Sequence, residues 1–386
     1  MPRLKLLLLL AFAHLAVDTI ALVVQPLWPD LRSGLKLSDA QFQAAFILWS
    51  LANSLLQLPI GYWAERHQAR WLIWAGPAVA AACVGGVGVV DSFWGLCLLL
   101  AAGGAGIAAF HPEAAAVVAS CAPNNRSRAL SIFSIGGYLG QAIGPFYAGK
   151  LTAASGLPAV AWTAVWGWMA LVVVGLGLRH APTQVAHAET AAIPLGQLLS
   201  GKKKVVALLV ALGVLRVTPV LGVPLALAFA IKETGGANDD VGSAQSLFMA
   251  AIGAGSIACA AFANRSNERR AFCSLPLAAA ASLAVCPSAT SVLLLACVAL
   301  SGFALGATLP LLVSCGQEIL PQGQRVASGL TMGVTWGLAS PLAAGTIELF
   351  DRLHQPADAF YVFAAVAAAS SALCLGLPER EASGDN

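Results

Sequence analysis

Twelve apolar runs, each long enough to cross a bilayer, constrain this chain more than any other feature. A membrane-spanning helix needs about 20 apolar residues. The runs lie at residues 6–28, 40–62, 71–90, 94–120, 129–155, 158–178, 205–230, 241–263, 271–289, 292–316, 326–347 and 359–377. Because 58% of the 386 residues are hydrophobic and only 10% are charged, the surplus apolar surface must face lipid. The sequence predicts an all-α membrane protein with twelve transmembrane helices.

The N-terminus imitates a secretory signal peptide but is too long for one. Arg3 and Lys5 precede the apolar stretch Leu6–Ala13, which alone would fit a cleaved segment. The apolar run continues to about Trp28. We therefore interpret it as the first transmembrane span.

A polar stretch at 179–204 divides the chain into two six-span bundles, 1–178 and 205–386, and the second bundle repeats the first. The loop from Gly61 to Arg70 is echoed 199 positions later, and residues 123–145 are echoed by 321–341 at offsets of 196 to 198. Two pseudo-symmetric, parallel halves are typical of transporters that bind substrate between them near the midplane.

Basic residues predict the orientation. With both termini in the cytoplasm, the predicted cytoplasmic segments hold fifteen of the 21 Lys and Arg residues and the outer loops hold four. Cytoplasmic loops carry an excess of basic residues in membrane proteins generally. Both termini are therefore predicted to be cytoplasmic.

Several stretches carry a family resemblance. The loop from Gly61 to Arg70 is similar to the signature Gly-x-x-x-Asp-Arg-x-Gly-Arg-Arg/Lys of the major facilitator superfamily, with Glu65 in place of Asp. The fifth run contains a Gly-Pro motif associated with proton-coupled antiporters in that superfamily. Closer similarity to the fosmidomycin-resistance family of efflux proteins lies in His14…Asp18, Phe110-His111-Pro112-Glu113 and Gln317-Glu318-Ile319-Leu320-Pro321. The fourth run lacks the basic residue that many drug/proton antiporters carry there, which argues against coupling by that route.

This resemblance implies the major facilitator fold and a secondary transporter of a bacterial cytoplasmic membrane. It favours proton-coupled efflux of a small drug-like or phosphonate-like compound by alternating access, working as a monomer with protons and the bilayer as its other partners. An uptake symporter or a uniporter is the alternative within transport. A non-transporting sensor or a channel is the alternative outside it.

Small residues and prolines are candidates for gating and bending. Glycines at spacing four let helices approach closely, and prolines interrupt the backbone hydrogen bonds of a helix. Plain packing explains the same pattern, and positive-inside topology explains the basic loop residues equally well. The gating candidates are Gly61, Glu65, Arg66, Arg70, Gly140, Gly144, Pro145, Gly337 and Pro341.

Charges within the apolar runs are the strongest functional candidates, since each costs about 2.5–3.5 kcal/mol at the bilayer centre. Asp18 lies near the middle of the first span, with His14 four residues earlier on the same helix face. Arg216 lies about as deep in the seventh span and is the repeat counterpart of Asp18. We expect Asp18, modulated by His14, to bind the coupling proton and Arg216 to attract an anionic or polar substrate across the cavity. A structural Asp18–Arg216 ion pair is the alternative.

His111 and Glu113 flank Pro112 in the fourth span. They are predicted to relay protons or to form a gate, or else to cap backbone groups that the proline frees. Uncharged residues that either line the substrate cavity or bond between helices are Gln25, Asn53, Gln57, Tyr138, Gln141, Gln245 and Trp336.

Other classes of function find no support in the sequence. The basic residues form no stripe that would bind nucleic acid. The HExxH and GxSxG motifs of metalloproteases and serine hydrolases are absent, so no enzyme activity is expected. The nine cysteines lie in or beside apolar runs without CxxC spacing, which predicts neither a disulfide framework nor a zinc site. No cofactor or metal is expected.

Overall fold

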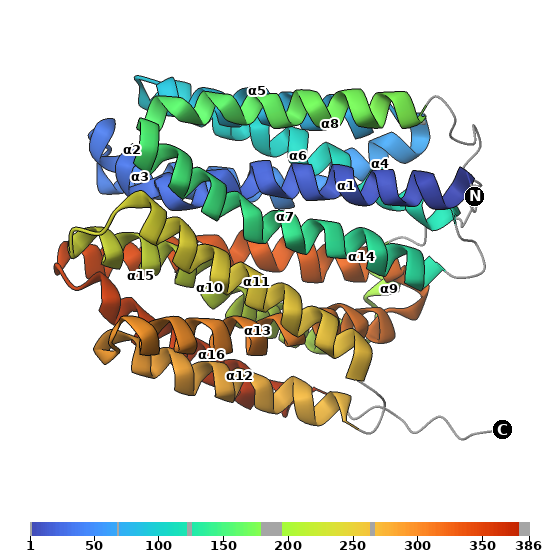
Figure 1. Ribbon diagram of the computed structural model, residues 1–386. Coiled ribbons are helices and arrows are strands. Elements are labelled where there is room, and N and C mark those ends of the chain that lie inside the picture. Colours follow the sequence, from blue (N-terminus) through green and yellow to red (C-terminus); the bar gives the residue numbers. More distant parts are fainter. Residues whose placement is uncertain (1, 68, 122–125, 179–194, 263–266, 378–386) are drawn as a thin grey trace.

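The computed structural model describes residues 2–67, 69–121, 126–178, 195–262 and 267–377. Long helices run side by side along one axis, and the first described helix begins at the same end of the molecule as the last described helix finishes (Figure 1). We call this the terminal end and the opposite one, which holds α2, the far end.

The helices before the undescribed stretch 179–194 form the N-terminal set. Their bounds are α1 Pro2–Val23, α2 Trp28–Gly34, α3 Asp39–Ser54, α4 Gln57–His67, α5 Leu72–Gly86, α6 Phe93–Cys121, α7 Arg126–Ser155 and α8 Thr163–Leu178. A short 3₁₀ turn, Gln25–Leu27, joins α1 to α2.

The remaining helices form the C-terminal set. Their bounds are α9 Leu195–Leu198, α10 Lys203–Glu233, α11 Asn238–Phe262, α12 Glu268–Val285, α13 Ser291–Ile319, α14 Gln324–Ser328, α15 Thr335–Arg352 and α16 Ala359–Cys374. A π-helical segment, Gly329–Val334, links α14 to α15.

The predicted membrane fold is confirmed. Ten of the described helical stretches are long and apolar enough to cross a membrane. Two more long stretches, α7 and the path from α14 to α15, lie alongside them and complete twelve spans (Figure 1). The two sets meet chiefly where α7 packs on α11 and where α3 packs on α15.

Two of the predicted spans contain a local irregularity. The second, 40–62, ends one helix at Ser54 and begins another at Gln57. Pro59 gives the physical reason, because it cannot donate a hydrogen bond to the carbonyl of Leu55 and its ring crowds that carbonyl. The eleventh, 326–347, contains the π-helical segment, which neither hydropathy nor proline position indicates. Pro145 and Pro341, in contrast, lie inside continuous helices.

Glycines bring α7 against α1 at backbone distance. A Cβ added at Gly136, Gly140 or Gly144 would collide with carbonyl oxygens of α1, those of Ala11, Leu15 and Thr19. The three glycines are spaced four residues apart, as are the three residues of α1 that they meet, so each set lies on one face of its helix. The small residues thus set the close approach that places side chains of α1 beside those of α7.

Candidate functional site

A buried polar cluster joins three helices of the N-terminal set. Asp18 on α1 lies at its centre, with one carboxylate oxygen 3.1 Å from Nε2 of His111 on α6. The other oxygen lies 3.5 Å from Nε2 of His14 and accepts a hydrogen bond of 2.9 Å from Nε2 of Gln141 on α7. We call these four residues the Asp18 cluster.

Hydrogen bonding fixes how the two imidazoles face the carboxylate. Nδ1 of His14 lies 2.9 Å from the carbonyl oxygen of Phe133, and Nδ1 of His111 lies 2.8 Å from that of Ile107. A carbonyl oxygen can only accept, so each Nδ1 carries a proton and donates it. In a neutral ring Nε2 then presents a lone pair to Asp18. A hydrogen bond between Nε2 and the carboxylate therefore requires an additional proton, on a histidine or on Asp18.

Local packing leaves room for this arrangement. The ring of His14 stacks on Phe133, with centroids 4.1 Å apart, and meets the ring of His111 edge-on at 5.0 Å. A Cβ at Gly137 would lie 2.5 Å from the His14 ring and 3.0 Å from Asp18. Glycine at position 137 therefore gives the cluster its space.

The cluster is enclosed but not sealed. The side chain of Asp18 is 6% exposed and that of His14 10%, whereas that of His111 is 21% exposed. No Lys or Arg side chain contacts these groups among the described residues. The sequence predicted the pairing of His14 with Asp18 from their spacing. It listed His111 and Gln141 separately, because their contact depends on how three helices pack.

Arg216 lies elsewhere. It is fully buried on α10, where its guanidinium carbon sits 3.7 Å from the ring centroid of Phe272 on α12. Its Nη2 donates to the carbonyl oxygen of Phe272, Nε and Nη1 lack a hydrogen bond among the described residues, and the thiols of Cys374 and Cys273 lie near the guanidinium. The structure does not bring Arg216 together with Asp18, so the alternative of an ion pair between them is wrong in this conformation.

The other candidates for the cavity occupy varied positions. Glu113 is buried on α6. The backbone oxygens of Gln25 and Asn53 accept hydrogen bonds from the side chains of Gln245 and Gln57. Tyr138 packs against Gly253 on α11, which places it where the two sets meet. Trp336 is half-buried against the main hydrophobic core.

The gating candidates at the terminal end are only partly described. Gly61 faces Pro112, to which an added Cβ would come within 3.2 Å, and Gly337 faces Leu51 of α3. Arg70 is half-buried. The side chains of Glu65 and Arg66 lie outside the described residues.

An ion-pair network at the far end was missed by the sequence analysis. Arg32 on α2 reaches Asp351 at 2.6 Å, Asp39 at 3.0 Å and Glu348 at 3.5 Å. Arg352 on α15 pairs with Asp39 and with Glu348. We call these five residues the far-end network. Arg32 and Arg352 are two of the four basic residues that the sequence analysis placed in the outer loops, and acidic residues at the ends of neighbouring spans were the available signal.

The far-end network joins the two sets of helices. Its links run from α2 and α3 of the first set to α15 of the second. Two further pairs do the same, Lys232 with Asp30 at 3.3 Å and Lys150 with Asp239 at 3.0 Å. In this conformation the far ends of the two sets are held together.

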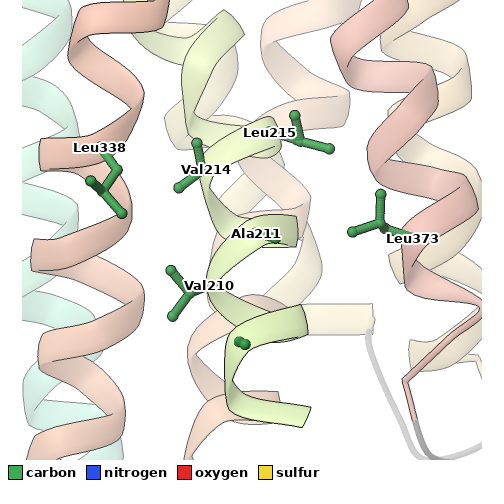
Figure 2. Close-up of a pocket in the computed structure, with 7 residues that line it drawn as sticks. Val210, Ala211, Val214, Leu215, Leu338 and Leu373 are labelled. Carbon is green, nitrogen blue, oxygen red and sulfur yellow. The ribbon is translucent and has the colours of Figure 1, made fainter. Parts of the chain in front are cut away.

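A separate groove lies on the C-terminal set and is purely apolar. Figure 2 shows Leu338 of α15 and Leu373 of α16 on either side of residues from α10. Its volume is about 600 Å³, and its lining consists of Ala207, Val210, Ala211, Val214, Leu215, Leu338 and Leu373. Without a polar group it has no means of handling protons or charged substrates.

The comparison with known families decides the class of protein. The sequence profile of the Major Facilitator Superfamily matches residues 7–344. The chain belongs to the major facilitator superfamily. It is therefore a multi-pass membrane transporter of the secondary kind, as the sequence predicted, and neither the family nor the fold is that of an enzyme.

Two curated relatives of this major facilitator protein were found. Over 165 residues, 43% of this chain and 41% of the relative, it is 30% identical to the fosmidomycin resistance protein of Escherichia coli. The chain thus aligns with less than half the length of that relative. Over 368 residues, 90% of this chain and 86% of the relative, it is 25% identical to the uncharacterized transporter YfnC of Bacillus subtilis, also of this superfamily.

Solved structures of the superfamily share the fold. A mutant of the nucleoside transporter NupG superimposes with a TM-score of 0.78 at 14% identity, covering 98% of this chain and all of that one. A bacterial homologue of the human lysosomal transporter Spinster, in an inward-facing and occupied conformation, gives 0.73 at 14% identity over 98% of each chain. At this identity the likeness concerns the fold alone.

Proposed function

We propose that this protein exchanges protons for a small drug-like or anionic compound and exports that compound by alternating access. The Asp18 cluster is the observation that carries the proposal. It is a carboxylate with two imidazoles, buried in the middle of a span, and an ionisable group at that depth is a functional candidate by default.

The hydrogen bonds of the cluster suit a group that gains and loses a proton. With both Nδ1 atoms committed to backbone carbonyls, one proton can be shared between Asp18 and the Nε2 atoms of His14 and His111. When that proton leaves, the lone pairs of the imidazoles face a charged carboxylate in a setting of low polarity. Substrate binding nearby would then be coupled to the proton through electrostatics.

The far-end network supports alternating access as the transport cycle. If the terminal end is cytoplasmic, as the basic residues predict, the network closes the periplasmic side. Loading from the cytoplasm is compatible with this state, and release to the outside requires the pairs made by Arg32 and Arg352 to break. Two halves, 1–178 and 205–386, linked by 179–204, would rock against each other as a monomer in the bacterial inner membrane.

The proposed substrate class rests on two weaker observations. The E. coli relative is named for resistance to fosmidomycin, which favours export of a drug-like compound. Arg216 adds a preference for anions, but because it is 0% exposed it can meet a substrate only in another conformation.

Transport in proteoliposomes tests the proposal. Purified protein is reconstituted, a pH gradient is imposed, and uptake of candidate compounds, including fosmidomycin, is followed against the gradient. We expect transport that collapses with a protonophore and falls at least about 100-fold in Asp18→Asn, which removes the proton site but keeps the shape of the side chain. Asp91→Asn, which changes an exposed loop carboxylate, is the matched control.

The outcome that would overturn the proposal is equally direct. Unaltered pH-driven transport in Asp18→Asn would make the cluster structural. Transport of the same compounds with no dependence on the pH gradient would instead indicate a uniporter.

A further inference from the structure

Three side chains of the Asp18 cluster present metal-ligand atoms to one another. Nε2 of His14, Nε2 of His111 and a carboxylate oxygen of Asp18 all lie within 4.8 Å of one another. The sequence offered no ligand spacing here, because His111 lies 93 positions from Asp18. We propose that these residues form a binding site for a first-row divalent transition-metal ion of the Zn²⁺ or Co²⁺ type.

Distances support this geometry. Zn²⁺ binds imidazole nitrogen and carboxylate oxygen at about 2.0–2.1 Å, so neighbouring ligands of a tetrahedral site lie about 3.3 Å apart. The two imidazoles approach different oxygens of Asp18, with Nε2 of His111 3.1 Å from Oδ1 and Nε2 of His14 3.5 Å from Oδ2, and the three ligand atoms together span up to 4.8 Å. Binding an ion therefore requires the widest of these separations to shorten by up to about 1.5 Å, which side-chain rotation of the histidines can supply.

The surrounding hydrogen bonds are those of a preorganised metal site. A histidine that ligates through one nitrogen generally donates the other N–H to a backbone carbonyl or a carboxylate. His14 and His111 both do so through Nδ1, to Phe133 and Ile107, which directs both Nε2 lone pairs at the same space. Gln141 holds one oxygen of Asp18. Two imidazoles and a carboxylate prefer Zn²⁺, Co²⁺ or Ni²⁺ over Mg²⁺ and Ca²⁺, which take oxygen ligands.

Charge and access are compatible with a cation. The three ligands carry one negative charge when the imidazoles are neutral, and no Lys or Arg side chain contacts them among the described residues. Partial exposure of His111 leaves a route for the ion, and three protein ligands leave a fourth position for water.

Metal binding would also affect transport, and this consequence rests on the proposed function. The ion would use the same carboxylate oxygens and imidazole nitrogens as the coupling proton. An occupied site should therefore arrest the cycle, so that micromolar Zn²⁺ inhibits pH-driven transport and a chelator restores it.

Co²⁺ titration of the full-length protein tests the site directly. The protein is purified without a polyhistidine tag and treated with chelator, and CoCl₂ is added while visible absorption is recorded, because tetrahedral Co²⁺ with nitrogen ligands absorbs strongly there. We expect one Co²⁺ per chain, displaced by Zn²⁺, with affinity weaker by more than about tenfold in His14→Ala and in His111→Ala. His354→Ala, which changes an exposed histidine at the far end, should bind as the wild type does.

Two results would overturn the inference. One is the absence of one-to-one Co²⁺ binding to wild-type protein, and the other is binding that both cluster variants retain at full strength. Size-exclusion profiles matching the wild type confirm that the variants are folded. Because neither substrate nor pH gradient is used, failure here leaves the proton-coupling proposal untouched, and failure of Asp18→Asn to alter transport leaves the metal site untouched.

Discussion

Asp18 and Arg216 were predicted from the sequence to be counterparts in the two repeats, and their surroundings in the structure differ completely. Asp18 lies among two imidazoles and an amide that donates to one of its oxygens, with partial access past His111. Arg216 is sealed against Phe272, with two of its nitrogens unpartnered among the described residues. The two charged residues were predicted at similar depths in their spans, yet Asp18 lies in a polar, partly accessible cluster and Arg216 lies in a closed apolar one.

The difference indicates a division of work between the halves. A group that exchanges protons needs partners that can hold a proton and a path for its release, and among the described residues the partners of Asp18 fit this requirement. A buried arginine with unsatisfied N–H groups is costly, so its retention needs a reason. We infer that Arg216 meets its partner in a different conformation, consistent with an anionic substrate.

After Asp18→Asn itself, the largest effect is expected from replacing a histidine that contacts Asp18. His111→Ala removes the 3.1 Å contact to Asp18, and a hydrogen bond to a charged group contributes about 1.5–3 kcal/mol. The rate of pH-driven transport should fall about 10- to 100-fold. His67→Ala, an exposed histidine bonded to its own helix, is the control. Normal rate and pH dependence in His111→Ala would indicate that this histidine serves only to cap backbone groups near Pro112.

The second prediction could break the comparison. Arg216→Met removes the buried charge but keeps most of the apolar bulk against Phe272. We expect KM for an anionic substrate to rise about tenfold, a loss of about 1.4 kcal/mol, with the number of protons moved per substrate unchanged. The unfolding temperature should not fall, because an incompletely bonded buried charge is removed. Unchanged KM in this variant would make Arg216 structural, and altered proton stoichiometry would assign coupling to both halves.

The smallest expected effect comes from the far-end network, which holds the far ends of the two sets of helices together in this conformation. Arg32→Gln removes three pairings of the far-end network, of which those to Asp39 and Asp351 are partly exposed and that to Glu348 is buried. Partly exposed pairs contribute up to about 1 kcal/mol each. Hydrogen exchange of backbone amides in 28–39 and 348–352 should accelerate at least about fivefold as the far ends separate.

Lys36→Gln is the control for that measurement, since Lys36 lies at the same end and outside the far-end network. Equal exchange in Arg32→Gln and wild type would show that packing, and not these ion pairs, holds the far ends together.

Hydropathy was sufficient to predict the fold, whereas the full Asp18 cluster could be identified only from the structure. Twelve spans follow from composition and length alone, because lipid demands long apolar helices. The His14–Asp18 pair follows from helical spacing. The contacts of His111 and Gln141 with Asp18 do not follow from helical spacing. They depend on the glycine-mediated approach of α7 to α1 and on the placement of α6 beside these two helices.

Sequence-based prediction also missed local helix irregularities and the pairing of charges at the ends of the spans. The break after Ser54 was foreseeable from Pro59, whereas the π-helical segment Gly329–Val334 has no sequence signal that we recognise. The far-end network was hidden because charges at span ends are expected in any membrane protein. Only the pairing of α2 and α3 with α15 shows that these charges meet.

Proton release from purified, detergent-solubilised protein tests the central claim most directly. A weakly buffered sample with a pH indicator receives candidate substrates, with wild type, Asp18→Asn and Asp91→Asn compared side by side. The account predicts substrate-dependent release of protons in the wild type and in Asp91→Asn, and none in Asp18→Asn. Substrate binding without proton release in the wild type, or equal release in Asp18→Asn, would contradict it.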